Sequence, residues 1–599
     1  RSLVGSEMCI RDRIKIYRGR PTIFVNGLPK AMPAYSPTGW RPGNFKKTIT
    51  WFCEIGMDLY FVSYPQPIGA AKWGEQIFWR GDIISDKPLW DFEFNIDEQI
   101  ASILKYNPGA YFIVRNGAFH CPSWRELHPE EMFMDRNGKI ADFPSLASKL
   151  WIDKVIEHGT TLVRWCESQP WAERLIGHWY GWENEGTPHQ TLSHQLFDYS
   201  RIMQKRFSLF LRKRYKTVEK LRDAWKRDDI SFDTGRLVPE EKVFADTETV
   251  RNLLYWQKDE ENKPLQDYLL CIAECFHSAF KRVSRALAKA SRGKQLFFYD
   301  CMKTTMIGWS NYGFFNAAYN WNNCFNETLA ASGHMRICDL LSLPTTQVAG
   351  IITPHDYQNR GIGGVFEPEG CVDSCVLRGK YFFAEGDVRT YNCDIENSAY
   401  GTARDIREFA AINWRNFATS LSRGFNYYWM DLVGDWFGNK EIQALIARAV
   451  KIQRDALHWQ KGHIPCIAMI IDDQSVLQTN GTGNPLSELI IEEWKGALSH
   501  CGVPYRIYLF EDLELEHFPA HRLFYFPNLF RCDEKRLALL RKKVMRDGNV
   551  VIWGPGSGIS DGKTISAANA EKLTGFKFNV IDVNYPRRVQ IVDFDHPIT

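Results

Sequence analysis

Runs of large apolar residues recur along the first three quarters of the chain. The first run, MPAYS, follows a hairpin that is marked by Asn26-Gly27. Runs that are apolar at nearly every position, rather than at alternate ones, are typical of strands buried on both faces of a parallel sheet. The pattern therefore predicts eight such strands, at Met32–Ser36, Met57–Tyr64, Ala110–Asn116, Leu175–Glu185, Gln295–Met302, Gln347–Pro354, Lys380–Asp387 and Gly424–Asp431.

Helical segments separate these strands. Apolar residues recur with helical spacing in Leu146–Cys166, Tyr268–Lys289 and Thr402–Ser420. The longest connection, Gly186–Gln295, contains a strongly basic helical segment, which we interpret as a solvated helix face that supports the barrel. Alternating strands and helices predict an α/β fold, a (β/α)8 TIM barrel with long loops; a doubly wound sheet is the alternative.

The pattern changes after about Gln460, where the repeating units become shorter. Four further strands, Ile464–Asp472, Tyr505–Phe510, Arg522–Pro527 and Asn549–Gly554, enclose helices. They predict a smaller flavodoxin-like α/β domain. We therefore expect a barrel over residues 14–460 and a second domain over residues 461–599, truncated at its C-terminus. Residues 1–13 resemble translated sequencing adapter from metagenomic reading frames, so we exclude them from the fold.

Composition narrows the range of partners. Among 599 residues, 74 basic and 71 acidic side chains nearly cancel, which argues against nucleic acid. No run of about 18 apolar residues occurs, so we expect no membrane span. The 15 cysteines are odd in number and scattered, which favours reduced thiols in a cytoplasm. The 21 Trp, 24 Tyr and 38 Phe supply ring faces on which sugars stack, so composition weakly favours a glycoside.

Two strands of the predicted barrel end in a glutamate. WYGWENEG places Glu185 after the fourth strand, and KYFFAEGDVRT places Glu385 at the end of the seventh. A single strand-end carboxylate is usually structural, but the ends of barrel strands meet at one mouth, and glycosidic bonds are broken by two carboxyl groups. We therefore predict Glu385 as nucleophile and Glu185 as general acid and base, with its pKa raised by an aromatic pocket. Carboxyls about 5 to 5.5 Å apart would retain the sugar's configuration, and a wider gap would invert it.

Other polar and aromatic residues are weaker candidates for substrate binding. Asn184 is placed to hold a sugar 2-hydroxyl. Arg115 is predicted to contact substrate or Glu385, or to form an internal ion pair; Tyr357 is predicted to hydrogen-bond the nucleophile, or to pack. Trp124 and Trp321 are candidate sugar platforms, although such residues are more often core or rim.

WYGWENEG followed by GKYFFAEGDVRT resembles the two catalytic strands of clan A retaining glycoside hydrolases, especially the family 42 β-galactosidases. The resemblance extends over roughly Ile14–Thr599 and includes IAMIIDDQS and HCGVPYRIYLFEDL, which look like that family's class I amidotransferase-like trimerisation domain. It implies a β-galactosidase-like hydrolase acting on a glycoside, without a cofactor, that assembles as a homotrimer. It also implies that Trp429 and Asp431, at the tip of the eighth strand, line the sugar site.

The sequence departs from that family in two ways. The cysteine cluster that holds zinc in many members is missing, and the pairs Cys271/Cys275 and Cys371/Cys375 lack a second ligand pair nearby, so we expect buried thiols and no metal. The two glutamates are also farther apart in sequence than is usual. A related β-glycosidase that acts on mannosides, glucuronides or arabinosides therefore stays open, as does a non-catalytic carbohydrate-binding barrel.

Overall fold

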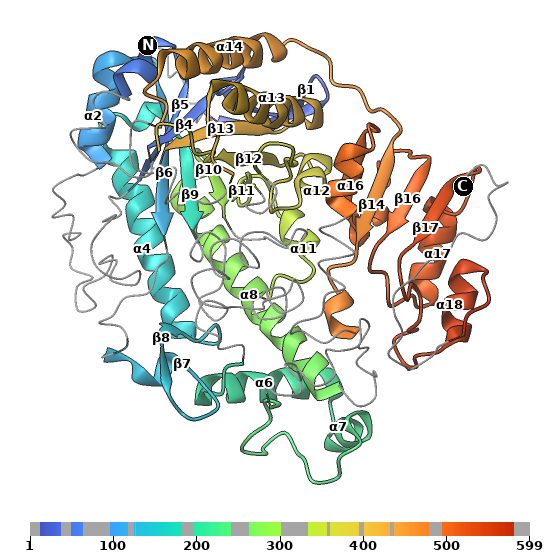
Figure 1. The fold of residues 1–599 in the computed structure, drawn as a ribbon. Helices are drawn as coiled ribbons and strands as arrows, with labels where there is room; N and C mark the ends of the chain where they lie inside the picture. The colour runs from blue at the N-terminus through green and yellow to red at the C-terminus, as the bar shows by residue number, and fades with distance from the viewer. Residues whose placement is uncertain are drawn as a thin grey trace, which may run out of the picture.

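The computed structural model describes residues 12–37, 49–63, 96–117, 125, 127–181, 197–240, 263–300, 333–355, 360–393, 401–431, 436–478 and 494–579. These residues form a closed parallel barrel, a four-stranded parallel sheet beside it, and two small antiparallel sheets (Figure 1). None of the helices in these ranges is both long enough and apolar enough to cross a membrane.

The eight predicted strands form the barrel, so the predicted (β/α)8 fold is confirmed. Each strand pairs in parallel with its neighbours in sequence, and the last pairs with the first, which closes the sheet. The strands are β4 (Ala34–Pro37), β5 (Leu59–Ser63), β6 (Tyr111–Gly117), β9 (Leu175–Gly181), β10 (Leu296–Tyr299), β11 (Gly350–Pro354), β12 (Tyr381–Gly386) and β13 (Asn426–Asp431).

Both faces of the barrel strands are buried, as continuous apolar runs predict. Alternate residues point inward and form one cluster inside the barrel, to which Phe61, Phe383 and Tyr428 contribute. The residues between them point outward into a second cluster under the helices. Gly177 of β9 lets two strands approach closely, because a Cβ there would lie 2.0 Å from the carbonyl oxygen of Leu296.

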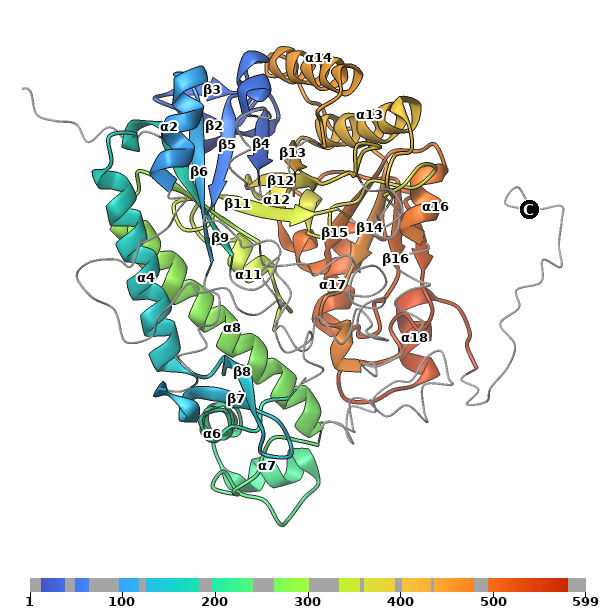
Figure 2. The same cartoon turned by 60° about the vertical axis from the view of Figure 1, so that its left-hand side comes forward.

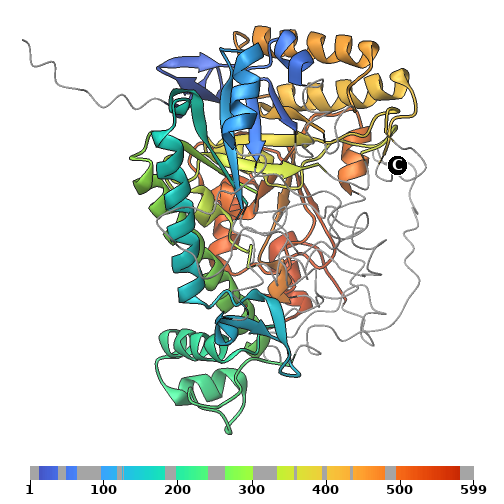
Figure 3. The same ribbon diagram turned by 90° about the vertical axis from the view of Figure 1, so that its left-hand side faces the viewer.

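Amphipathic helices cover the barrel. Helix α4 (Lys149–Ser168) is capped by Ser148, whose side chain accepts a hydrogen bond from the Trp151 N–H. Helix α13 (Ile406–Arg423) ends at Gly424, which adopts a left-handed φ of 83°. Beside it in space runs α14 (Lys440–Ala456), and Figure 3 shows the pair in gold and orange.

The predicted long connection forms an extension at one end of the barrel. Helix α8 (Lys263–Ala290) runs alongside α4 and continues past the barrel to α6 (Arg201–Tyr215) and α7 (Val218–Trp225), as Figure 2 shows. A separate apolar cluster joins these helices; its members include Phe207, Leu211, Trp225 and Tyr268. The small sheet of β7 (Met132–Met134) and β8 (Ile140–Pro144) lies at the same end.

The N-terminal hairpin extends further than the sequence predicted. Strand β2 (Arg20–Val25) turns at Asn26-Gly27 into β3 (Leu28–Lys30), and both turn residues have positive φ, as expected. However, β2 also pairs with β1 (Asp12–Tyr17). Excluding all of residues 1–13 from the fold was therefore wrong for the last two, because their backbone extends the antiparallel pairing with β2.

A second sheet stands beside the barrel. Its order is β15 (Tyr505–Leu509), β14 (Ile467–Ile471), β16 (Leu523–Phe526) and β17 (Val550–Trp553), all parallel. Helices α16 (Trp494–His500), α17 (Glu534–Lys543) and α18 (Ala567–Thr574) accompany it (Figure 1). The four predicted strands are present. The division at residue 460 and the amidotransferase-like character stay predictions.

Buried charges join the two sheets. Arg423 at the end of α13 is 4% exposed and forms ion pairs with Glu367 and Asp373. Asp373 lies in α12 (Val372–Leu377), and its carboxylate also accepts the backbone N–H of Ile507 in β15 at 2.8 Å. The hydroxyl of Tyr505 donates to Glu367 at 2.7 Å. The network leaves each of these charges with a partner in the interior.

Buried neutral histidines predict that stability falls in mild acid. His178, 1% exposed, lies with Nε2 2.8 Å from Gln295 Oε1, and burial lowers its pKa to about 4. A histidine in the unfolded chain has a pKa near 6.5. Between pH 6.5 and pH 4 the unfolded state is therefore protonated at this residue while the folded state is not, so the free energy of unfolding decreases as the pH falls through this range. For His178 the loss should reach roughly 2 kcal/mol by pH 5.

Urea unfolding at pH 5 and pH 7.5 checks this expectation. His178→Asn keeps a donor for Gln295 and removes the titration, so its stability should change less with pH than that of the wild type, by the same roughly 2 kcal/mol. Equal pH dependence of the two proteins would contradict the assignment to His178.

Candidate active site

Glu385 lies inside the barrel, at the carboxyl end of the strands. It is the penultimate residue of β12, pairs in register with Tyr428 of β13, and is 5% exposed. The Tyr428 hydroxyl donates a hydrogen bond to Glu385 Oε2 at 2.7 Å. In parallel α/β barrels this end of the strands is where catalytic residues collect, so Glu385 is well placed for chemistry.

Tyr428 keeps its proton and so remains a donor. Burial raises its pKa well above the ordinary value, and the nearby charge of Glu385 raises it further. A hydrogen bond from a neutral hydroxyl stabilises a carboxylate more than a carboxylic acid. Tyr428 therefore favours the ionised form of Glu385, which is the form that can attack an electrophilic carbon.

Arg115 of β6 brings a positive charge into the same layer. Its guanidinium carbon lies 4.3 Å from the ring centroid of Trp179 in β9, and it is 8% exposed. The Trp179 ring meets the Tyr428 ring edge-on at 6.4 Å, and the Arg115 charge acts to lower the Tyr428 pKa. The structure thus brings Arg115 and Glu385 together around Tyr428. Buried Arg115 Nε has no hydrogen-bond partner among the described residues.

A charged network fixes the chain directly after Glu385. Asp387 pairs with Arg360, lies 3.2 Å from Arg389 Nη1, and has His355 Nε2 at 3.6 Å. Burial alone would raise the pKa of Asp387, but the charge of Arg360 and the neighbouring His355 and Arg389 hold that pKa well below its usual range. Asp387 therefore stays a paired carboxylate and anchors the end of β12.

Two predicted substrate contacts of β13 lie elsewhere. Trp429 points out of the barrel and is 1% exposed; its ring stacks on Phe417 of α13 with centroids 6.4 Å apart. Asp431, also 1% exposed, accepts the backbone N–H of Trp436 at 3.2 Å. The sequence analysis placed both at the sugar site, whereas the structure gives Trp429 a packing contact under α13 and Asp431 a backbone contact beyond β13.

The remaining predicted site residues lie outside the described residues. They are Glu185, Asn184, Trp124, Trp321 and Tyr357. Strand β9, which leads to Glu185, is described as far as Gly181. The separation of the Glu185 and Glu385 carboxyl groups, on which the stereochemical outcome depends, therefore stays a prediction.

Sequence reasoning missed Tyr428 and Trp179. Both lie in runs in which every residue is large and apolar or aromatic, so periodicity does not show which residues face inward. Strand register could have identified Tyr428. If Glu385 faces the barrel interior, its register partner on the next strand, Tyr428, must face the interior as well.

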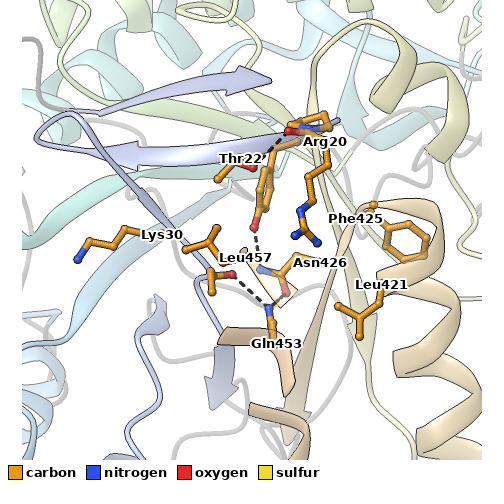
Figure 4. Close-up of a pocket in the computed structure, with 12 residues that line it drawn as sticks. Arg20, Thr22, Lys30, Leu421, Phe425, Asn426, Gln453 and Leu457 are labelled. Carbon is orange, nitrogen blue, oxygen red and sulfur yellow. Dashed lines mark hydrogen bonds between the residues drawn. The ribbon is translucent and has the colours of Figure 1, made fainter. Parts of the chain in front are cut away.

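A small cavity lies at the opposite, amino-terminal end of the barrel (Figure 4). Arg20, Thr22 and Lys30 line it from the hairpin, and Gln453 donates there to Asn426 Oδ1 at 2.9 Å. Its volume of about 40 Å³ suits a few water molecules and not a sugar ring. The cavity is also remote from the strand ends that carry Glu385, so we do not assign it to the reaction.

Neither a protein-family model nor a curated protein sequence matches this chain. Solved structures do match. A β-galactosidase from Bacillus circulans sp. alkalophilus has a TM-score of 0.59 at 12% identity, over 89% of this chain and 72% of its own. A catalytic mutant of a family 42 β-galactosidase from G. stearothermophilus has a TM-score of 0.58 at 10% identity, over 90% and 73%.

A further match comes from an enzyme with another printed activity. The family 42 exo-carrageenase of Bacteroides ovatus has a TM-score of 0.53 at 12% identity, over 93% of this chain and 69% of its own. Identities this low establish a common fold and leave the reaction to be argued from the site. With its closed eight-stranded barrel, the chain has the fold of the family 42 β-galactosidases.

Proposed function

We propose that the protein is a retaining β-glycosidase of the β-galactosidase type. The observation that carries this proposal is Glu385, a buried carboxylate at the carboxyl end of β12 that accepts a hydrogen bond from Tyr428 inside a closed barrel. The fold shared with glycoside hydrolases supports it, as does the sequence pattern that supplies Glu185 as a second carboxyl group.

The proposed reaction has two displacements. In the first, a Glu385 oxygen bonds to the anomeric carbon while the bond to the leaving oxygen breaks and Glu185 protonates that oxygen. In the second, Glu185 takes a proton from water, the water oxygen bonds to the anomeric carbon, and the Glu385 ester bond breaks. Both residues return to their starting protonation states, and the sugar keeps its configuration.

Other residues would orient the sugar. We propose that Asn184 holds the 2-hydroxyl, that Tyr357 hydrogen-bonds the nucleophile, and that Trp124 and Trp321 offer ring faces. Arg115 would hold a sugar oxygen or balance the charge of Glu385. We assign no sugar contact to Trp429 or Asp431, because Trp429 packs under α13 and Asp431 binds the backbone of Trp436.

A screen of aryl β-glycosides tests the proposal. The panel contains the galactoside, mannoside, glucuronide and arabinoside, and proton NMR identifies the anomer released first. We expect turnover of at least one substrate with the β-anomer formed first. Release of the α-anomer would show inversion, and sugar binding without turnover of any substrate would favour the non-catalytic alternative.

A β-glucuronide is the second candidate substrate. The buried Arg115 guanidinium has an unpartnered Nε among the described residues, and such a group is a good partner for a sugar carboxylate. A preference for the glucuronide that disappears in Arg115→Gln would support this candidate, whereas a preference for the galactoside would exclude it.

Tyr428→Phe should reduce activity without unfolding the protein. The change removes the bond to Glu385 and keeps the packed ring, so we expect kcat/KM to fall roughly 10- to 100-fold, equivalent to about 1.5 to 3 kcal/mol for a bond to a charged group. Loss of the donor disfavours the carboxylate, so the acidic limb of the kcat/KM profile should move to higher pH.

Tyr427→Phe is the matched control for that variant. Tyr427 is the adjacent residue and points outward, away from Glu385; its hydroxyl donates to Asn413 Oδ1 at 3.4 Å and also lies in hydrogen-bond contact with Asn416. Its activity and pH profile should be those of the wild type. If both variants lose activity equally, the effect of Tyr428 is structural and the proposed bond to the nucleophile has no special role.

We further propose a homotrimer that assembles through the second sheet, and a cytoplasmic location. The first rests on the sequence resemblance and is tested by light scattering of the full chain. The second is supported by the cysteines, since all eleven in the described residues are free thiols. Cys271, Cys275, Cys371 and Cys375 are buried, as the sequence analysis expected.

A further inference from the structure

Three carboxyl groups meet at one edge of the second sheet. Asp472 and Asp473 follow the end of β14, and Glu511 follows the neighbouring strand β15, in the 3-10 turn Phe510–Glu514. Because β14 and β15 are parallel neighbours, their carboxyl ends lie at the same edge. One oxygen of each residue lies within 4.8 Å of the other two.

Two oxygens in this cluster are buried without a hydrogen-bond partner in the described part of the chain. They are Asp473 Oδ1 and Glu511 Oε2, and Asp473 itself is 0% exposed. Their companion oxygens are used: Asp473 Oδ2 accepts the Ile337 N–H at 3.2 Å, and Glu511 Oε1 accepts from Gln474 at 2.7 Å. Orphaned carboxylate oxygens in a protein interior point to a missing cation or proton.

The local charge does not balance. Arg536 of α17 contacts both Asp472 oxygens, at 2.6 and 3.1 Å, and supplies one positive charge against three carboxylates. With all three carboxyl groups ionised, two negative charges are left uncompensated by Arg536, and one divalent cation would neutralise them.

We propose that Asp472, Asp473 and Glu511 bind a calcium ion at the carboxyl edge of the second sheet. Carboxylate oxygens are the ligands that hard divalent cations prefer. Calcium takes oxygens at about 2.3 to 2.6 Å in a flexible geometry, so two of its ligands lie at most about 4.6 to 5.2 Å apart, and the three oxygens here lie within 4.8 Å of one another. Magnesium demands near-ideal octahedral geometry and gives up its water reluctantly, so a buried site made of carboxylates suits it less.

The ion would also stabilise the contact between the second sheet and the segment that connects two barrel strands. Asp473 holds the backbone of Ile337, which immediately precedes α11 (Cys338–Leu341), between barrel strands β10 and β11. A cation that fixes Asp473 therefore fixes this contact as well. Its role is structural, and the inference is independent of the proposed glycosidase activity.

Calorimetric titration of the chelator-treated full chain with CaCl2 and with MgCl2 tests the proposal. We expect one calcium ion per chain, with weaker or no magnesium binding, and a rise in melting temperature of at least about 3 °C at saturating calcium. Asp473→Asn and Glu511→Gln should each weaken calcium binding at least about tenfold, and each keeps an acceptor for its existing hydrogen bond.

Glu514→Gln is the matched control. Glu514 lies in the same turn, 52% exposed and 3.2 Å from Lys535, and this variant should bind calcium like the wild type. Absence of binding to the wild type, tighter binding of magnesium, or unchanged affinity in Asp473→Asn and Glu511→Gln would overturn the proposal. If one of these variants does not fold, the other decides the result.

Discussion

Glu385→Ala is expected to abolish turnover of aryl β-glycosides, with kcat lowered by roughly four orders of magnitude or more. Without the carboxylate no glycosyl ester forms, and alanine leaves space where the nucleophile stood. Removal of the carboxylate also leaves the buried Tyr428 hydroxyl without this acceptor, so we expect a loss of stability of roughly 1 to 3 kcal/mol beside the loss of turnover. Steady-state rates with a nitrophenyl glycoside, together with the melting temperature, measure both effects.

Chemical rescue distinguishes a lost nucleophile from a damaged protein. Azide can enter the space left in Glu385→Ala and attack the anomeric carbon, so added azide should restore turnover and yield the α-glycosyl azide. Glu408→Gln serves as control: Glu408 pairs with Arg404 at the exposed start of α13, and its loss should change neither activity nor stability measurably. Turnover by Glu385→Ala equal to that of the wild type would refute the assignment of the nucleophile.

Glu185→Ala is expected to lower kcat about 10²- to 10⁴-fold for a phenyl glycoside. The loss should be much smaller when the leaving group is dinitrophenolate, which departs without a proton. The basic limb of the pH profile, which reports the general acid, should disappear. A series of aryl glycosides with leaving groups of graded pKa measures this dependence directly.

The control for that series is Glu173→Gln, an exposed glutamate just before β9, which should behave as the wild type at every leaving group. An equal loss for all leaving groups in Glu185→Ala would mean that Glu185 does not donate the proton. In that case a second carboxyl group at another strand end would have to be sought.

The barrel was predictable because its strands are uniform. Each apolar run has the length of a strand and ends in a polar or turn residue, and these local signals place the strands without knowledge of which face points inward. The same uniformity explains the error at Trp429. When both faces are buried, a tryptophan that packs under a helix cannot be told from one that faces the barrel interior.

The position of Glu385 was predictable, because it lies at the end of an apolar strand; its role as nucleophile stays a prediction. Contacts that depend on register across strands, as at Tyr428, were not predictable, and neither were contacts between strand ends that come together only in the folded chain. Asp472, Asp473 and Glu511 show the second case, because they follow two strands that end about 40 residues apart, and no short spacing of ligand residues in the sequence links them.

The buried contacts of Arg423 with Glu367 and Asp373 have a thermodynamic consequence. If the second sheet detached from the barrel, Asp373 would lose the Ile507 N–H and Glu367 would lose the Tyr505 hydroxyl, while the ion pairs of both carboxylates with Arg423 would become exposed to water. Partial opening therefore sacrifices several interior polar bonds at once. The barrel and the second sheet should therefore unfold together in one cooperative transition, so that a destabilising substitution in either sheet lowers the stability of both.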